Sequence, residues 1–198
     1  MSRTATWSGI STSVRRIARG VSLSESGPVA TSTTCSTASM MVRERIRMTE
    51  AEIGEFLAAP LTASLATIGP DGTPHLVAMY YAPQEDGRLA FWTYRTSQKA
   101  RNLARDPRCA LLIETGDGYD QLRGVQVRGT VEVIEDPDQV RPIGAAVYGR
   151  YLDGGLPEGV GSFLDDQARK RNAYLVTREH VASWDHRKLA AASAAPSG

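Results

Sequence analysis

The side chains best suited to bind an anion lie in one short run after the apolar stretch that ends at Trp92. Thr96 and Ser97 carry hydroxyls of the kind that cap a helix, and the residues after them have a helical pattern. Lys99 and Arg101 then fall near the first turn of that helix, although the positive end of a helix dipole disfavours cations. A bound phosphate would reverse this penalty, because it accepts hydrogen bonds from free backbone N–H groups, from the two hydroxyls and from Lys99.

Asn102 lies three residues after Lys99 on the same helical face, so it belongs to the candidate anion site. The competing interpretation is a capped surface helix whose lysine and arginine are solvated. Motifs for other chemistry are missing, since the sequence has no HExxH, GxSxG, Walker or GxGxxG motif and no Cys/His cluster at zinc spacing. The histidines, His75, His180 and His186, are scattered singly and are expected to be structural or surface residues. Neither a metal site nor a catalytic side chain is therefore predicted.

The elements around this run indicate a small antiparallel domain. Thr49 and Glu52 have the spacing of a capping box, and the apolar residues behind them predict a helix that Pro60 ends. Five to seven strands with helices between hairpins favour an α+β barrel over a parallel sheet, and Gly129 indicates a bend. Helical patterns also cover residues 97–105, 136–151 and 162–170. Strand patterns cover residues 61–68, 73–82, 88–94, 108–115, 122–134, 172–177 and 181–189.

Three segments are predicted along the chain. Residues 48–189 form the folded, cofactor-binding domain, and residues 190–198 form a flexible tail. Most of residues 1–47 is rich in Ser and Thr without periodicity, which predicts a disordered extension. The same composition also fits a start codon assigned too early, with Met48 or one of the two methionines before it as the true start, or a short targeting segment.

Composition narrows the class of protein. Hydrophobic residues make up 41% and charged residues 23% of the chain, which is typical of a globular domain. A formal net charge of +1 and the lack of a basic stripe argue against nucleic acid as a partner. Since no apolar run reaches the roughly 18 residues that span a bilayer, no membrane partner is predicted. Two cysteines, Cys35 and Cys109, do not suggest a disulfide framework, so a cytoplasmic location is predicted.

Several short motifs together carry a family resemblance over residues 48–189. In chain order they are Ala63-Ser64-Leu65-Ala66-Thr67, Gly72-Thr73-Pro74-His75, Phe91-Trp92-Thr93, Ser97-Gln98-Lys99-Ala100 and Asn102-Leu103 with Asp106-Pro107-Arg108. This succession resembles the pyridoxamine 5'-phosphate oxidase-like, FMN-binding split-barrel superfamily. The spacing and the closing run from Ser183 to Leu189 resemble its branch of flavin/deazaflavin oxidoreductases, which use coenzyme F420, more than the true pyridoxamine phosphate oxidases.

The resemblance implies a fold, an assembly and a site. The fold is of the α+β class, a six-stranded antiparallel Greek-key split β-barrel with peripheral helices. The assembly is a homodimer in which each cofactor lies in a groove between subunits. By position, the strand that contains Val77 supports the cofactor ring. The end of the strand that contains Trp92, together with the start of the helix after Ser97, holds the anion. The implied cofactor-binding residues are Val77, Ala78, Met79, Trp92, Thr93, Thr96, Ser97, Gln98, Lys99 and Asn102.

Two positions depart from the pattern of the FMN-binding members. Those members have a basic residue beside the lysine, where this chain has Gln98, and a lysine near the end of the preceding strand, where it has the uncharged run Met79-Tyr80-Tyr81. Fewer cations for a terminal phosphate favour coenzyme F420, whose internal phosphodiester and polyglutamate tail need cations along a track. Candidates for that track, with solvated arginines as the alternative, are Arg101, Arg105, Arg123 and Arg128.

The resemblance further implies an oxidoreductase in which reduced F420 delivers hydride to an unsaturated or conjugated small molecule. An FMN-dependent reductase or oxidase is the alternative enzyme. A non-catalytic carrier or sensor of flavin or deazaflavin is the alternative from another class. In an enzyme, the glycine-rich run 153–159 would be a substrate lid, although an ordinary connection between two helices accounts for it equally well.

Overall fold

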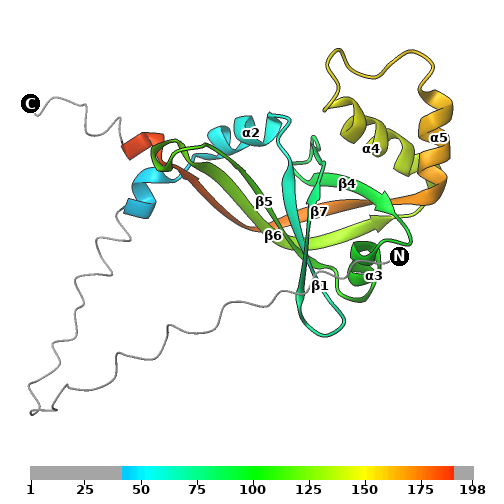
Figure 1. The fold of residues 1–198 in the computed structure, drawn as a ribbon, viewed down its shortest axis with the longest axis horizontal. Helices are drawn as coiled ribbons and strands as arrows, with labels where there is room; N and C mark the ends of the chain where they lie inside the picture. The colour runs from blue at the N-terminus through cyan, green and yellow to red at the C-terminus, as the bar shows by residue number, and fades with distance from the viewer. Residues whose placement is uncertain (1–41, 190–198) are drawn as a thin grey trace, which may run out of the picture. The chain divides into compact units, whose positions relative to one another are not determined.

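The computed structural model describes residues 42–189, and its main element is one antiparallel sheet of seven strands in the order β2-β1-β5-β6-β7-β4-β3 (Figure 1). The strands are β1 (Ala63–Ile68), β2 (Pro74–Met79), β3 (Ala82–Pro83), β4 (Leu89–Tyr94), β5 (Arg108–Thr115), β6 (Arg123–Ile134) and β7 (Arg171–Asp185). The helical elements are residues 42–46, α2 (Glu50–Ala58), α3 (Gln98–Arg105), the 3-10 turn η1 (Tyr119–Gln121), α4 (Pro137–Gly149) and α5 (Gly161–Lys170).

The predicted fold class, an antiparallel α+β split barrel with peripheral helices, is confirmed. The strand number is corrected from six to seven by β3, a strand of two residues that pairs with the start of β4. The pattern over residues 73–82 predicts one strand, but the chain bends between β2 and β3. Tyr81 turns into the core and is fully buried, whereas Tyr80 is 55% exposed, so this pair of tyrosines separates the two strands.

A bulge between β6 and β7 joins what the sequence suggests are two strands. Arg128 pairs with His180 and Gly129 pairs with Arg178, so Glu179 is an extra residue on β7. Arg178, Glu179 and His180, the polar residues that separate the two predicted strand patterns, therefore lie within one continuous strand. This bulge also accounts for the bend that Gly129 indicates, and the two separate strands predicted at 172–177 and 181–189 are corrected to β7 alone.

Two apolar clusters stabilise the sheet and its helices. The first lies inside the sheet's curve and includes the fully or almost fully buried residues Leu65, Phe91, Leu111, Val125 and Tyr174. Phe91 and Tyr174 stack with ring centroids 4.9 Å apart, which ties β4 to β7. Residues of α2 and α3 complete this cluster. The second cluster joins α4 and α5 to β4 and β7 through Trp92, Val140, Val147, Leu164, Ala168 and Ala173.

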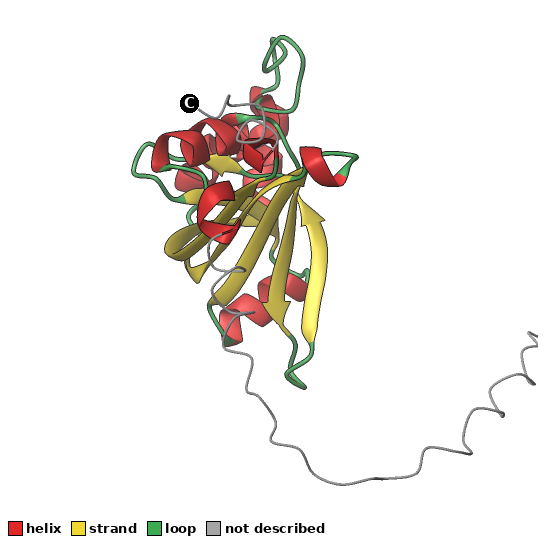
Figure 2. Cartoon of the chain, turned by 90° about the vertical axis from the view of Figure 1, so that its left-hand side faces the viewer, coloured by secondary structure: helices red, strands yellow, loops and turns green. Residues whose placement is uncertain are grey.

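The helices gather at both ends of the strands (Figure 2). α2 leads directly into β1, and α3 packs against the other end of β1, where the Asn102 amide donates to Thr67 Oγ1. The Arg150 guanidinium, at the end of α4, donates to the carbonyl oxygens of Leu57 and Ala59. These contacts tie the end of α4 to the end of α2, where the Leu57 carbonyl oxygen also accepts from the Tyr81 hydroxyl.

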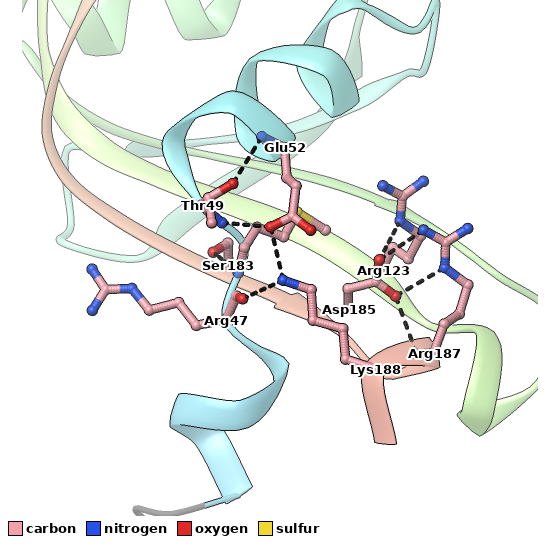
Figure 3. Close-up of polar contacts among 9 residues, drawn as sticks. Arg47, Thr49, Glu52, Arg123, Ser183, Asp185, Arg187 and Lys188 are labelled. Carbon is pink, nitrogen blue, oxygen red and sulfur yellow. Dashed lines mark hydrogen bonds and ion pairs between the residues drawn. The ribbon is translucent and has the colours of Figure 1, made fainter. Parts of the chain in front are cut away.

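Polar contacts join the start of α2 to the end of β7 (Figure 3). The predicted capping box is present, because Thr49 N donates to Glu52 Oε2 at 2.7 Å and Glu52 N donates to Thr49 Oγ1 at 3.3 Å. Lys188 Nζ donates to the same Glu52 oxygen and to the Arg47 carbonyl oxygen, each at 2.7 Å. Met48 N donates to Ser183 Oγ at 3.1 Å. These contacts hold the first and last segments of the described chain next to each other.

No helix within residues 42–189 is long and apolar enough to cross a membrane. Residues 42–46 are helical, and Ile46 and Met48 are buried against the domain. The rest of the predicted N-terminal extension, residues 1–41, and the predicted tail, residues 190–198, lie outside the described residues.

Candidate anion and cofactor site

The junction between β4 and α3 has the local structure that an anion site requires. Ser97 is the N-cap residue of α3, and its Oγ accepts from Ala100 N at 3.3 Å. Thr93, at the end of β4, lies with its Oγ1 3.3 Å from Ser97 Oγ and so orients the cap. The first turn of α3 contains no acidic residue. The positive end of the helix is therefore open to an anion, with the Thr96 hydroxyl exposed beside it.

Lys99 occupies this first turn as a half-buried cation. Burial lowers the pKa of its ammonium group, and the positive charge of Arg171 lowers it further. Within residues 42–189, no ion pair joins Lys99 to a carboxylate. A partly desolvated cation without a counterion is suited to bind a phosphate.

Arg171 is a residue of this site that sequence reasoning missed. As the first residue of β7 it lies opposite Tyr94 of β4, and its guanidinium carbon is 3.9 Å from the centroid of the Tyr94 ring. The centroid of the Trp92 ring is 4.8 Å away from the same carbon. Arg171 reaches the junction only because β4 and β7 pair, and nothing in its local sequence signals that pairing.

Gln98 and Asn102 bind each other instead of facing outward together. Gln98 Nε2 donates to Asn102 Oδ1 at 2.9 Å, and Asn102 Nδ2 donates to Thr67 Oγ1 at 3.0 Å. The Asn102 side chain is fully buried, whereas Gln98 is exposed. Asn102 therefore holds α3 against β1, and its contribution to a bound anion would be to position Gln98 and the helix start.

Trp92 is 8% exposed and lies beneath α4. A Cβ atom on Gly144 would lie 2.4 Å from the Trp92 ring, so α4 contacts the ring through a position that has room only for glycine. Thr93 is 4% exposed. The rings of Trp92 and Tyr94 form the floor of the junction, on which the Arg171 guanidinium is stacked.

The strand predicted to support a cofactor ring is β2, at one edge of the sheet. Val77 and Met79 are half-buried against the main core, and Ala78 is exposed on the opposite face. They pair with the first half of β1, whereas α3 contacts the other end of β1. Within the described chain, no hydrogen bond or ion pair links these three residues to the β4–α3 junction.

The arginines of the suggested track are dispersed. Arg105 donates to the Ile68 carbonyl oxygen, while Arg123 lies over the Phe56 ring beside Asp185. Arg128 lines a cavity of about 410 Å³ at the β6–β7 bulge, with His180 and Arg108. A second cavity, of about 580 Å³, lies between residues 43–47 and the end of β7. Neither cavity is lined by Lys99 or Arg171.

Cys109 is expected to be chemically inert in the folded protein. Burial, together with the negative charge of Glu179, raises the pKa of its thiol to about 12, so almost no thiolate forms near neutral pH. With Cys35→Ser to remove the other cysteine, native protein should react with an aromatic disulfide reagent at least about 100-fold more slowly than unfolded protein. Equal rates would show that Cys109 is accessible and ionised.

Comparison with known proteins assigns a family. Residues 49–185 match the family described as pyridoxamine 5'-phosphate oxidase. A pyridoxine/pyridoxamine 5'-phosphate oxidase from Rhodopseudomonas palustris strain TIE-1 is 33% identical over 79 residues, which are 40% of this chain and 36% of that relative. One from Cupriavidus pinatubonensis is 33% identical over 115 residues, 58% of this chain and 49% of the relative. The chain thus spans less than half the length of these curated relatives.

Two solved structures are informative. The conserved hypothetical protein Rv2991 from Mycobacterium tuberculosis is 42% identical with a TM-score of 0.70, over 79% of this chain and 94% of that chain. A structure described as an F420 reductase is 30% identical with a TM-score of 0.51, over 64% of this chain and 93% of that chain. The family match covers the sheet, the β4–α3 junction and the helices around it. The chain therefore belongs to the pyridoxamine 5'-phosphate oxidase family.

Proposed function

We propose that this protein is an oxidoreductase that binds the deazaflavin coenzyme F420 and uses its reduced form to deliver hydride to an unsaturated or conjugated small molecule. The main observation in support of this proposal is the cationic start of α3, where half-buried Lys99 has no carboxylate partner within the described chain. The 30% identity to an F420 reductase supports the choice of coenzyme. A cytoplasmic location is proposed with it.

The residues at the junction fit the phosphate of such a cofactor. The donors are one ammonium group, the hydroxyls of Thr96 and Ser97, and backbone N–H groups at the helix start. The first turn of α3 holds no carboxylate that would repel an anion. When bound, the cofactor supplies the hydride chemistry. The protein's residues would bind the phosphate, orient the ring along β2 and exclude water, so a catalytic acid or base is not required.

We also propose that the cofactor site is completed in a homodimer. The outer face of β2, β1 and β5 carries small or apolar side chains, with Ala66 between Leu76 and Ala110 and Ser64 between Ala78 and Leu112. Leu76 is 68% exposed. Small side chains allow another protein surface to approach closely, and an exposed leucine at its edge gains from burial. Sedimentation of the purified protein measures this association directly.

Fluorescence titration with F420 and FMN in parallel tests the choice of cofactor. Saturable binding of F420 alone at micromolar concentration or below would support the proposal and justify a screen of substrates. Preference for FMN would favour the FMN-dependent reductase or oxidase. Tight binding without oxidation of the reduced coenzyme by any acceptor would indicate a carrier or sensor, and binding of neither cofactor would reject the proposal.

Replacing Lys99 with alanine should weaken F420 binding by about 1 to 3 kcal/mol, because the variant loses a charge-assisted hydrogen bond to phosphate. The same titration measures the loss. Lys170→Ala, which removes an exposed lysine just before β7, is the matched control and should bind as the wild type does. An unchanged affinity of Lys99→Ala would place the phosphate elsewhere.

A further inference from the structure

The Arg171 guanidinium is fixed in position but is left with unused hydrogen-bond donors. Nε and Nη2 donate to Gln167 Oε1 at 3.1 and 3.0 Å, and the rings of Tyr94 and Trp92 lie against the guanidinium. A guanidinium has five N–H donors, so most of them have no acceptor within residues 42–189. Gln167 and both rings carry no net negative charge, so none of these contacts supplies a counterion.

A second cation therefore lies near Lys99 without a counterion. Within residues 42–189, Arg171 forms no ion pair with a carboxylate, and neither does Lys99. Burial lowers the pKa of Lys99 most, and the positive charge of Arg171 lowers it further. Two like charges near each other raise the energy of the empty site, and an anion bound between them removes that cost.

The floor beneath Arg171 is built to hold the side chain in this place. Arg171 faces Tyr94 across the β4–β7 pairing, and Arg95 Nε donates to the Arg171 carbonyl oxygen at 3.2 Å. Trp92, on which the guanidinium stacks, is itself locked under Gly144. A guanidinium that is ordered in advance loses little conformational entropy when it binds a ligand.

We propose that Arg171 is a cofactor-binding residue whose guanidinium donates hydrogen bonds to the same phosphate that Lys99 binds at the start of α3. This inference rests on the proposed function and extends it, because the phosphate is then held by cations from two elements, α3 and β7. The planar donor pair of arginine matches two phosphate oxygens, which a lysine at this position would not do. Phosphodiester and phosphate monoester share this chemistry, so F420 and FMN are tested separately.

The experiment compares Arg171→Gln with wild type in titrations of matched ligands. F420 is paired with its phosphate-free deazaflavin riboside, and FMN is paired with riboflavin. Arg171→Gln should bind the phosphate-bearing member of the preferred pair at least tenfold more weakly and its phosphate-free partner as the wild type does. Arg171→Lys, which keeps the charge but not the planar donor pair, should show a smaller loss. Lys170→Gln removes a neighbouring exposed charge and should change neither titration.

The outcomes separate this inference from the function on which it rests. If wild type binds F420 or FMN and Arg171→Gln binds it equally well, Arg171 is not a phosphate ligand, and the proposed function stands. An equal loss for the phosphate-free partner would also overturn the assignment, since Arg171 would then act by packing. If Arg171→Gln unfolds, the affinities of Arg171→Lys decide between the outcomes. A weaker affinity for the phosphate-bearing ligand alone supports the assignment. An unchanged affinity for both the phosphate-bearing and the phosphate-free ligand overturns the bidentate contact. Wild type that binds neither F420 nor FMN rejects the proposed function together with the inference.

Discussion

Gly129→Ala is expected to destabilise the domain by about 3 kcal/mol or more. A Cβ atom at this position would lie 1.8 Å from the carbonyl oxygen of Thr177, which is backbone of the neighbouring strand and is not free to rotate away. Gly129 lies at the bulge between β6 and β7, so the added methyl group would force apart the longest strand pair of the sheet. Urea denaturation followed by circular dichroism would show the loss as a lower midpoint.

Gly54→Ala is the matched control for that experiment. Gly54 lies in α2, and a Cβ atom there would meet no atom within 4 Å. Because alanine is the better helix former, this variant should be more stable than wild type by roughly 0.5 to 1 kcal/mol. If Gly129→Ala were as stable as wild type, the bulge would have to relax easily, and the pairing of Arg128 with His180 would not describe the native register.

Asp185→Asn is expected to cost about 3 kcal/mol of stability at neutral pH. The Asp185 carboxylate is 4% exposed and accepts from Arg187 Nη2 at 2.7 Å and Arg187 Nε at 2.9 Å, with Arg123 Nε 3.1 Å away (Figure 3). An asparagine would leave both cations without their counterion. The loss is tempered because the Arg187 side chain is 56% exposed and therefore partly solvated. Asp166→Asn, in an exposed pair with Arg169, should cost under about 1 kcal/mol.

The contribution of Asp185 should also depend on pH. Hydrogen bonds from Arg187 lower the pKa of the Asp185 carboxyl, aided by the nearby charges, so the folded state binds its proton less readily than the unfolded chain does. The stabilisation is therefore complete above the unfolded pKa of about 3.9 and is lost as pH falls through the folded pKa. The difference in unfolding free energy between wild type and Asp185→Asn should be constant near pH 7 and shrink below about pH 4. A difference that stays constant into acid would mean that the carboxylate does not interact with its arginines.

Local sequence patterns predicted most elements because their causes are local. The capping box of Thr49 and Glu52 and the Ser97 cap depend on residues three positions apart, and both are present. Strand patterns located β5 and β6, whose inward residues meet one core. β7 was predicted as two strands because a bulge on one strand depends on the register of its partner, and alternation within a single strand does not contain that register.

Sequence patterns predict only the part of the candidate anion site that lies in one continuous segment. Ser97 and Lys99 follow β4 directly, so the motif shows them together. Arg171 joins them through the pairing of β4 with β7, a long-range contact. Its presence also changes the charge argument for the cofactor. The motif itself has the uncharged Gln98 beside Lys99, but Arg171 supplies a second cation from another strand. The comparison of F420 with FMN by titration therefore carries more weight than a count of cations in the motif.

The partners of β4 have a consequence for biosynthesis. Among the described strands, β4 pairs with β3 over two residues and with β7 over six, from Leu89 with Val176 to Tyr94 with Arg171. A nascent chain that has not yet reached β7 leaves most of β4 without a strand to pair with, and the start of α3 then has no floor. The β4–α3 junction therefore takes its folded form only after β7 has been synthesised and has paired with β4.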